Sequence, residues 1–145
     1  MKVNSLLKFR GKNKLSRKLF EKIVERKGLS IPVNAEIDKS VNFVHNAYGA
    51  VIHPKAIIKK NVKIYQGVTL GRADIYNDIS KSKMECIIVD EGAIVCAGAK
   101  ILCKEGNLIV GKNTVVGANS VLTCSTGENE IWCGIPAKKI GERGF

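Results

Sequence analysis

The chain has 145 residues, a length that fits one domain, and 45% of its residues are hydrophobic. Its longest apolar runs are only a few residues, far short of the ~20 that a spanning helix needs, which argues against a membrane-spanning chain. The five cysteines form no C-x-x-C pair, and no secretory leader is recognisable. We therefore expect a reduced protein of the cytoplasm.

The net charge of +11 is concentrated near the N-terminus. Residues 1–28 contain ten lysines and arginines against two glutamates, so they hold eight of the eleven net charges. Between Asn13 and Lys27, apolar side chains recur at helical spacing, and Gly28 is a natural helix end. The pattern predicts a short basic amphipathic helix after a loose N-terminus. Its charged face is either solvated or in contact with anionic lipid or an acidic polymer.

A six-residue period begins after Leu29. Aliphatic side chains recur at every sixth position, and a small or compact residue usually follows four positions later. These positions, aliphatic except for Phe43, are Ile31, Ile37 and Phe43; Ile52, Ile58, Ile64 and Leu70; Val89, Val95 and Ile101; and Val110, Val116 and Leu122. This hexapeptide period is typical of a parallel β-helix, in which three short strands and three bends make one triangular coil. Asparagines and glycines such as Asn61, Asn119 and Gly98 suit the bends.

Interruptions of the period divide the chain. Nine residues rather than six lead from Phe43 to Ile52, and we expect them to form a bulge that points His45 outward into a cleft. Residues 72–87 break the period with charged side chains, which predicts an excursion loop, and residues 103–108 form a smaller break. The hexads stop at residue 125, and we expect the tail to return along the outside. The predicted organisation is a helical segment (1–28), a β-helix (29–124) and a C-terminal tail (125–145).

Four segments occur in order between about Ile31 and Gly141: IHPKAIIKKNVKIYQGVTLG, EGAIVCAGAKIL, VVGANSVL and WCGIPAKKIG. They resemble the serine acetyltransferase branch of the hexapeptide-repeat acyltransferases, especially the O-acetyltransferases of capsule and exopolysaccharide synthesis. The resemblance implies an all-β solenoid, a left-handed parallel β-helix with a short N-terminal α-helix and an excursion loop. The hand rests on the resemblance alone, because crossovers between parallel strands are usually right-handed.

The resemblance also implies an activity: transfer of an acetyl group from acetyl-CoA to a hydroxyl of a surface polysaccharide or its precursor. His45, in the segment FVHNAYG, matches the general base of the family. An imidazole suits that role because its unperturbed pKa is near ~6.5. The resemblance further implies a homotrimer with clefts between subunits. The basic N-terminal segment would hold it at the inner face of the membrane or on an anionic glycan.

The resemblance assigns further site residues by position. Those expected to bind the acceptor are Asn46, Tyr48, His53, Gln66, Arg72, Asp74 and Asp78. Those expected to bind acetyl-CoA are Gly71, Ala97, Gly98, Ala118, Lys138 and Lys139, with the two lysines meeting its phosphates as point charges. From the residues themselves, a structural hydrogen bond is the favoured interpretation of His53, and a solvated loop is favoured for Asp74 and Asp78.

Two departures from the family pattern bear on the acceptor. Val44 stands where the serine enzymes have an aspartate and Cys86 where they have a second histidine, which favours a sugar over serine. Serine, a nucleotide-sugar amine and a small xenobiotic remain alternative acceptors, and a non-catalytic basic scaffold is the alternative of another class. No metal is expected, because two histidines cannot supply the three imidazoles of a zinc enzyme. Nucleic acid is not an expected partner, because the few aromatic residues are not interleaved with the basic ones.

Overall fold

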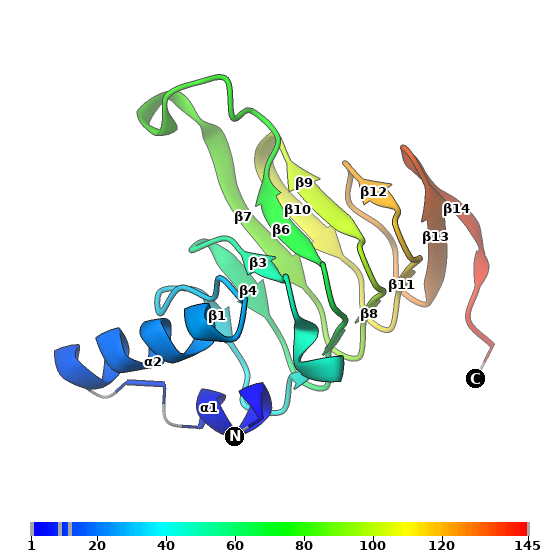
Figure 1. Cartoon of the computed structure of the whole chain (residues 1–145). Helices are drawn as coiled ribbons and strands as arrows, with labels where there is room; N and C mark the ends of the chain where they lie inside the picture. The colour runs from blue at the N-terminus through cyan, green and yellow to red at the C-terminus, as the bar shows by residue number, and fades with distance from the viewer. Residues whose placement is uncertain (1, 9, 12, 145) are drawn as a thin grey trace.

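The computed structural model describes residues 2–8, 10–11 and 13–144, and Lys12 of the basic segment lies outside them. The described chain winds as a solenoid, and each full coil adds one strand to each of three sheets (Figure 1). Sheet 1 contains β1 (Glu36–Ile37), β4 (Ala56–Ile58), β7 (Lys83–Val89) and β10 (Glu105–Val110). Sheet 2 begins with β2 (Asn42–Phe43), β5 (Lys63–Ile64), β8 (Ile94–Val95) and β11 (Val115–Val116). Sheet 3 contains β3 (Val51–Ile52), β6 (Thr69–Arg72), β9 (Lys100–Cys103) and β12 (Val121–Leu122).

The predicted aliphatic positions form the core of this solenoid. Ile64, Val95 and Val116 stand opposite one another on successive parallel strands of sheet 2, and all three are fully buried. The other aliphatic positions are buried as well, except that Ile37 of the first coil is only partly buried. A two-residue strand is not stable alone. The coils are therefore held together by stacked side chains, at roughly 25 cal/mol for each Å² of apolar surface that they bury.

The bends have the left-handed backbone that their asparagines and glycines predicted. The angle φ is 58° at Asn61, 54° at Asn119 and 71° at Gly98. The side-chain oxygen of Asn119 occupies the space that a Cβ atom on Gly98 would need. Glycine is thus required at this bend both by its φ angle and by the close approach of the next coil.

The N-terminus is not the loose leader that the sequence predicted. Helix α1 (Val3–Leu7) contacts β2 and the turn after it, and it buries Val3, Leu6 and Leu7. A five-residue helix is too short to be stable in isolation, which is why sequence patterns do not indicate it. Its stability comes from burying three apolar side chains against the first coil.

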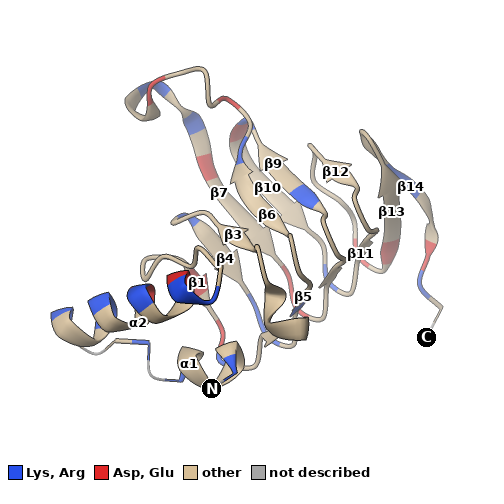
Figure 2. Cartoon of the chain, in the orientation of Figure 1, with Lys and Arg blue, Asp and Glu red and all other residues tan. Residues whose placement is uncertain are grey.

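Helix α2 (Lys14–Arg26) agrees with the predicted amphipathic helix, but only one side of it packs on the solenoid. Phe20 and Val24 are buried, whereas Leu15 and Leu19 are 78% and 57% exposed. Figure 2 shows lysines and arginines along the length of α2. Neither α1 nor α2, nor any other helix among the described residues, is long and apolar enough to cross a membrane.

The excursion loop is shorter than the predicted 72–87. It spans residues 73–82, contains the short helix η2 (Ile79–Lys81) and projects from the ends of β6 and β7 (Figure 1). Residues 83–86 belong to β7 because they pair with the first residues of β10. The break predicted at residues 103–108 is shorter than expected, because β9 ends at Cys103 and β10 begins at Glu105, and both Cys103 and Leu108 are buried.

The tail does not return along the outside as predicted, because it continues sheet 2. Strand β13 (Glu130–Gly134) pairs in parallel with β11, and β14 (Ala137–Glu142) pairs with β13 in the antiparallel direction. Two buried hydroxyls of the fourth coil fix the tail. Thr114 Oγ1 donates to the Gly127 carbonyl at 2.7 Å, and Ser120 Oγ accepts from the Gly134 N–H at 3.0 Å.

Candidate active site

The bends between sheet 2 and sheet 3 stack into one continuous edge, here named the 2/3 edge (residues 44–49, 65–67, 96–98 and 117–119). Backbone hydrogen bonds join its coils. The Gly67 N–H donates to the Tyr48 carbonyl at 2.8 Å, and the Gly98 N–H donates to the Gln66 carbonyl at 2.9 Å. Seven of the predicted site residues lie on this edge: His45, Asn46, Tyr48, Gln66, Ala97, Gly98 and Ala118.

His45 lies in η1 (Val44–Ala47), the turn between β2 and β3, and the predicted bulge is present there. His45, Asn46 and Ala47 all have left-handed backbones, with φ angles of 52°, 56° and 45°. Three successive non-glycine residues in this region are unusual, and such strain persists where the surrounding structure enforces it. The His45 side chain is exposed, and its ring meets the Tyr65 ring edge-on, with the centroids 6.1 Å apart. The imidazole is therefore open to a substrate but oriented by a neighbour.

Helix α1 supports this turn, although sequence reasoning placed nothing there. Ala47 is fully buried, and Asn46 Oδ1 accepts from the Val3 N–H at 3.4 Å. Just before the turn, the Phe43 N–H donates to Asn4 Oδ1 at 2.8 Å. The N-terminal segment is thus part of the structure that fixes the candidate base.

A pocket of about 380 Å³ opens beside His45. Its lining residues are Lys2, Asn4, Asn42, Phe43, Val44, His45 and Asn46. A larger cavity of about 590 Å³ lies at sheet 1 beside Glu36, Lys60 and Glu91, and none of the predicted site residues lines it. We take the pocket beside His45 as the candidate acceptor site, because the exposed His45 imidazole is one of its lining groups.

The other predicted acceptor residues lie at a different corner, where sheet 3 turns into sheet 1. Gln66 and Arg72 belong to one coil but are six residues apart, and an extended chain of that length spans about 20 Å. Asp74 is 3% exposed and pairs with Arg72 at 3.5 Å, so the solvated state predicted for it is wrong. Asp78 is exposed, as predicted. This second group therefore lies on a different edge of the chain from His45.

His53 makes the structural hydrogen bond that its sequence context favoured. The Lys55 N–H donates to His53 Nδ1 at 3.1 Å, so the ring accepts there and its proton lies on Nε2. Burial, followed by the positive charges of Lys55 and Arg72, lowers the pKa of His53. The ring is therefore held neutral, as an acceptor for the backbone.

The two lysines expected to meet the CoA phosphates differ in their surroundings. Lys139 Nζ lies 2.9 Å from Glu142 and 3.0 Å from Glu130. The hydrogen bonds to Glu142 and then Glu130 raise the pKa of Lys139. Because two carboxylates already neutralise Lys139, the exposed Lys138 is the better placed of the two for an added phosphate.

The resemblance matched Cys86 to the second histidine of the family, but its surroundings do not suit a base. Its Sγ–H donates to Asn107 Oδ1 at 2.9 Å, and burial, followed by the charge of Glu85, raises the pKa of the Cys86 thiol. The side chain is therefore a thiol at neutral pH and not a base. Across residues 2–8, 10–11 and 13–144, no group of three or more His, Cys, Asp or Glu side chains is arranged to hold a metal ion.

Sequence reasoning missed several side chains of the 2/3 edge. Tyr65 contacts His45, and Lys100 Nζ donates to the Gly67 carbonyl. Burial raises the pKa of Cys96, whose backbone N–H donates to the Val116 carbonyl on the next coil at 2.9 Å. Tyr65 and Cys96 are the first residues of their bends, and Lys100 begins the strand that follows a bend, so the register of the coils is the signal that could have found them.

No protein-family model matches the chain. Among curated proteins, a serine acetyltransferase of Haemophilus influenzae is 37% identical over 108 residues, which are 74% of this chain and 37% of that protein. A serine acetyltransferase of Staphylococcus aureus is 34% identical over 122 residues, 81% of this chain and 51% of that protein. Among solved structures, serine acetyltransferase of Brucella abortus in complex with coenzyme A has a TM-score of 0.72 at 27% identity, over 98% of this chain and 53% of that one.

These similarities support placing the chain in the hexapeptide-repeat transferase superfamily. They also show that the solenoid is a left-handed parallel β-helix, as the sequence resemblance implied. The particular proteins that it matches are serine acetyltransferases, and the chain spans about half the length of these relatives or less. A closer relationship to the capsule and exopolysaccharide enzymes stays a prediction.

Proposed function

We propose that the protein transfers an acetyl group from acetyl-CoA to a hydroxyl, with His45 as the general base. The exposed imidazole, held by a strained turn beside a pocket on the 2/3 edge, is the observation that carries this proposal. Neutral His45 takes the proton of the acceptor hydroxyl while the hydroxyl oxygen attacks the thioester carbonyl. The carbon–sulfur bond then breaks, and the CoA thiolate leaves and takes up a proton. No covalent enzyme intermediate is required.

The 2/3 edge supports a place for acetyl-CoA. Ala97, Gly98 and Ala118 carry at most a methyl side chain, so an extended pantetheine arm can approach the backbone of successive bends closely. Lys138 on β14 is exposed and supplies a cation for the phosphates. The Brucella abortus protein, which shares this fold, is in complex with coenzyme A.

Two acceptors are proposed for testing. Both curated relatives are serine acetyltransferases, which makes serine the first candidate. The second candidate is a sugar hydroxyl of a surface polysaccharide or its precursor. A specific observation favours it, because Val44 places no carboxylate next to His45 and Cys86 is a neutral thiol.

We further propose that three copies assemble with cyclic symmetry. The predicted residues lie at two different corners of one chain, and in a cyclic assembly the corner of one copy can face the 2/3 edge of the next. Residues such as Arg72 and Asp78 would then complete the site beside the neighbour's His45. The arrangement explains why one chain alone separates them.

CoA thiol release from acetyl-CoA tests the function, with serine, nucleotide sugars and capsule-type oligosaccharides as acceptors. The variant His45→Asn keeps a residue type that tolerates the left-handed turn but removes the base. We expect acceptor-dependent release to fall by ~10²-fold or more, with an unchanged melting temperature, because His45 is exposed. Equal release by both proteins would contradict the role of His45. A protein that does not bind acetyl-CoA would instead be a non-catalytic basic scaffold.

A further inference from the structure

The pocket beside His45 is built in part by the N-terminal segment. Strand β2 is the edge strand of sheet 2, and the Asn4 side chain hydrogen-bonds to its backbone on the side where no further strand pairs. The Phe43 N–H donates to Asn4 Oδ1 at 2.8 Å, and Asn4 Nδ2 donates to Asn42 Oδ1 at 2.9 Å. These two bonds fix Asn4 at the pocket, and Lys2, two residues earlier in the chain, also lines it.

The direction of the hydrogen bonds decides which polar groups the pocket offers. Asn42 Oδ1 accepts from Asn4, and Asn46 Oδ1 accepts from the Val3 N–H. With both amide oxygens engaged, the Nδ2 groups of Asn42 and Asn46 are the ends left to donate to a ligand. The ammonium group of Lys2 adds three more donors and a positive charge.

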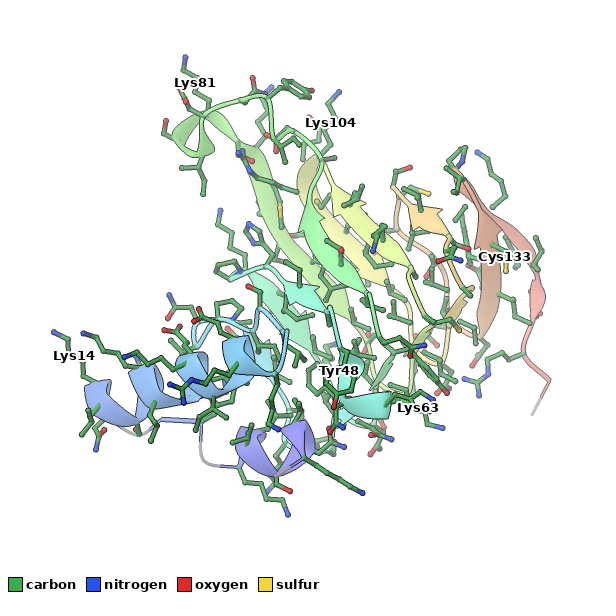
Figure 3. All side chains as sticks on the ribbon, in the orientation of Figure 1. Lys14, Tyr48, Lys63, Lys81, Lys104 and Cys133 are labelled. Atoms are coloured by element: carbon green, nitrogen blue, oxygen red, sulfur yellow. The ribbon has the colours of Figure 1, made fainter. Side chains whose placement is uncertain are left out.

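The charge around the pocket has one sign. Among its described lining residues, Lys2 is basic and none is acidic. Just outside it, the exposed Lys63 stands opposite Asn42 on the neighbouring strand β5, and Figure 3 shows it beside η1. A site that offers donors and positive charge is complementary to an oxygen-rich anion.

We propose that this pocket binds an anionic group of the acceptor, so that the substrate is a hydroxyl compound carrying a carboxylate or a phosphate near the acetylated position. The inference rests on the proposed function and narrows its acceptor class. An acidic sugar unit satisfies it. Serine also carries a carboxylate near its hydroxyl, but it fits less well, because its ammonium group would enter a pocket that holds a lysine and no carboxylate.

Binding of matched pairs of small molecules, one anionic and one not, tests the charge requirement without depending on acetyl transfer. Ligand-observed NMR titrations of the full chain, tagged at the C-terminus, compare glucuronate and glucose 1-phosphate with glucose, and glycerate with serine. We expect each anionic sugar to bind at least ~10-fold more tightly than glucose, and glycerate more tightly than serine, with an advantage that shrinks as salt screens the charge. The two anionic sugars distinguish a carboxylate preference from a phosphate preference.

Two variants and a matched control locate the effect. Lys2→Gln removes the charge of the pocket, and Asn4→Asp keeps the acceptor for the Phe43 N–H but adds a negative charge. Both variants should lower the ratio of the dissociation constants of glucose and the anionic sugar by ~10-fold. Lys8→Gln, an equal charge loss at an exposed position of the same segment outside the pocket, should leave it unchanged.

The outcomes separate this inference from the proposed function. Equal binding of glucose and glucuronate by the unmodified protein would overturn the inference, and so would a preference that Lys8→Gln reduces as much as Lys2→Gln. If the anionic probes bind as expected but no acetyl-CoA is bound or consumed, the proposed acetyl transfer fails and the anion site stands. If acetyl-CoA is consumed with neutral acceptors as readily as with anionic ones, acetyl transfer stands and the anion site fails.

Discussion

The two histidines of the chain have opposite surroundings, although they are only eight positions apart. His45 is exposed on a strained turn, and its ring is free to meet a substrate. His53 is partly buried and accepts a hydrogen bond from the Lys55 N–H. The sequence predicted this difference in surroundings, because His53 immediately precedes a proline at a turn, whereas His45 lies inside the nine-residue bulge.

The lowered pKa of His53 predicts a pH dependence of stability. Above the unfolded value of ~6.5, the ring is neutral in both states and adds no pH dependence. As the pH falls below ~6.5 and through the lowered folded pKa, the unfolded state binds the proton more readily, so the folded state loses stability. Protonation also removes the acceptor for the Lys55 N–H.

Urea unfolding measures this effect. Between about pH 7.5 and about pH 5, the free energy of unfolding should fall more for the natural chain than for His53→Asn. The asparagine oxygen can still accept from the Lys55 N–H but does not titrate, and all other titrating groups are common to both proteins. An equal fall in both would show that His53 does not contribute.

Among the elements, the bends accept the fewest residue types. Gly98→Ala would place a Cβ against the Asn119 side chain and force alanine to a φ near 71°. We expect the free energy of unfolding to fall by about 1–3 kcal/mol. Gly141→Ala on β14 is the matched control, because nothing lies within 4 Å of its added Cβ. Urea unfolding of both variants checks the difference, and equal losses would contradict the close stacking of the bends.

At the scale of the whole molecule, the projecting loop is the least explained part of the single chain. Ile75, Tyr76 and Ile79 are 76%, 74% and 74% exposed on it. Large apolar side chains gathered on a protruding loop are typical of a contact surface. We therefore place this loop against the neighbouring copy in the proposed trimer.

Sedimentation velocity tests that assembly. The natural chain should sediment as a species of three times the 15.8 kDa chain mass. The double variant Ile75→Ser with Ile79→Ser should shift towards monomer, because it removes the apolar surface of the loop. Leu15→Ser with Leu19→Ser on α2 removes a comparable exposed apolar surface elsewhere and should not. A monomeric natural chain would refute the trimer, and a loop variant that stays trimeric would place the contact elsewhere.

The sequence by itself determined the solenoid, its core positions, its bends and the place of His45. A β-helix can be predicted in this way because its repeat is local. The apolar side chain at every sixth position points inward, whichever coil lies next to it. The bulge at His45 was likewise predictable, because it lengthens the spacing between two core positions, Phe43 and Ile52, from six residues to nine. The left hand came from resemblance and was confirmed by solved structures.

Only the tertiary structure decided what surrounds His45. The contacts of Asn4 with β2 join residues about forty positions apart, and no periodicity in the sequence encodes them. The burial of Asp74 with Arg72 and the pairing of residues 83–86 with β10 also depend on neighbouring strands and coils. The split of the predicted site between two corners follows from the triangular cross-section, because residues six apart in one coil end on different edges. Those long-range contacts determine the polarity of the pocket, on which the proposed class of acceptor rests.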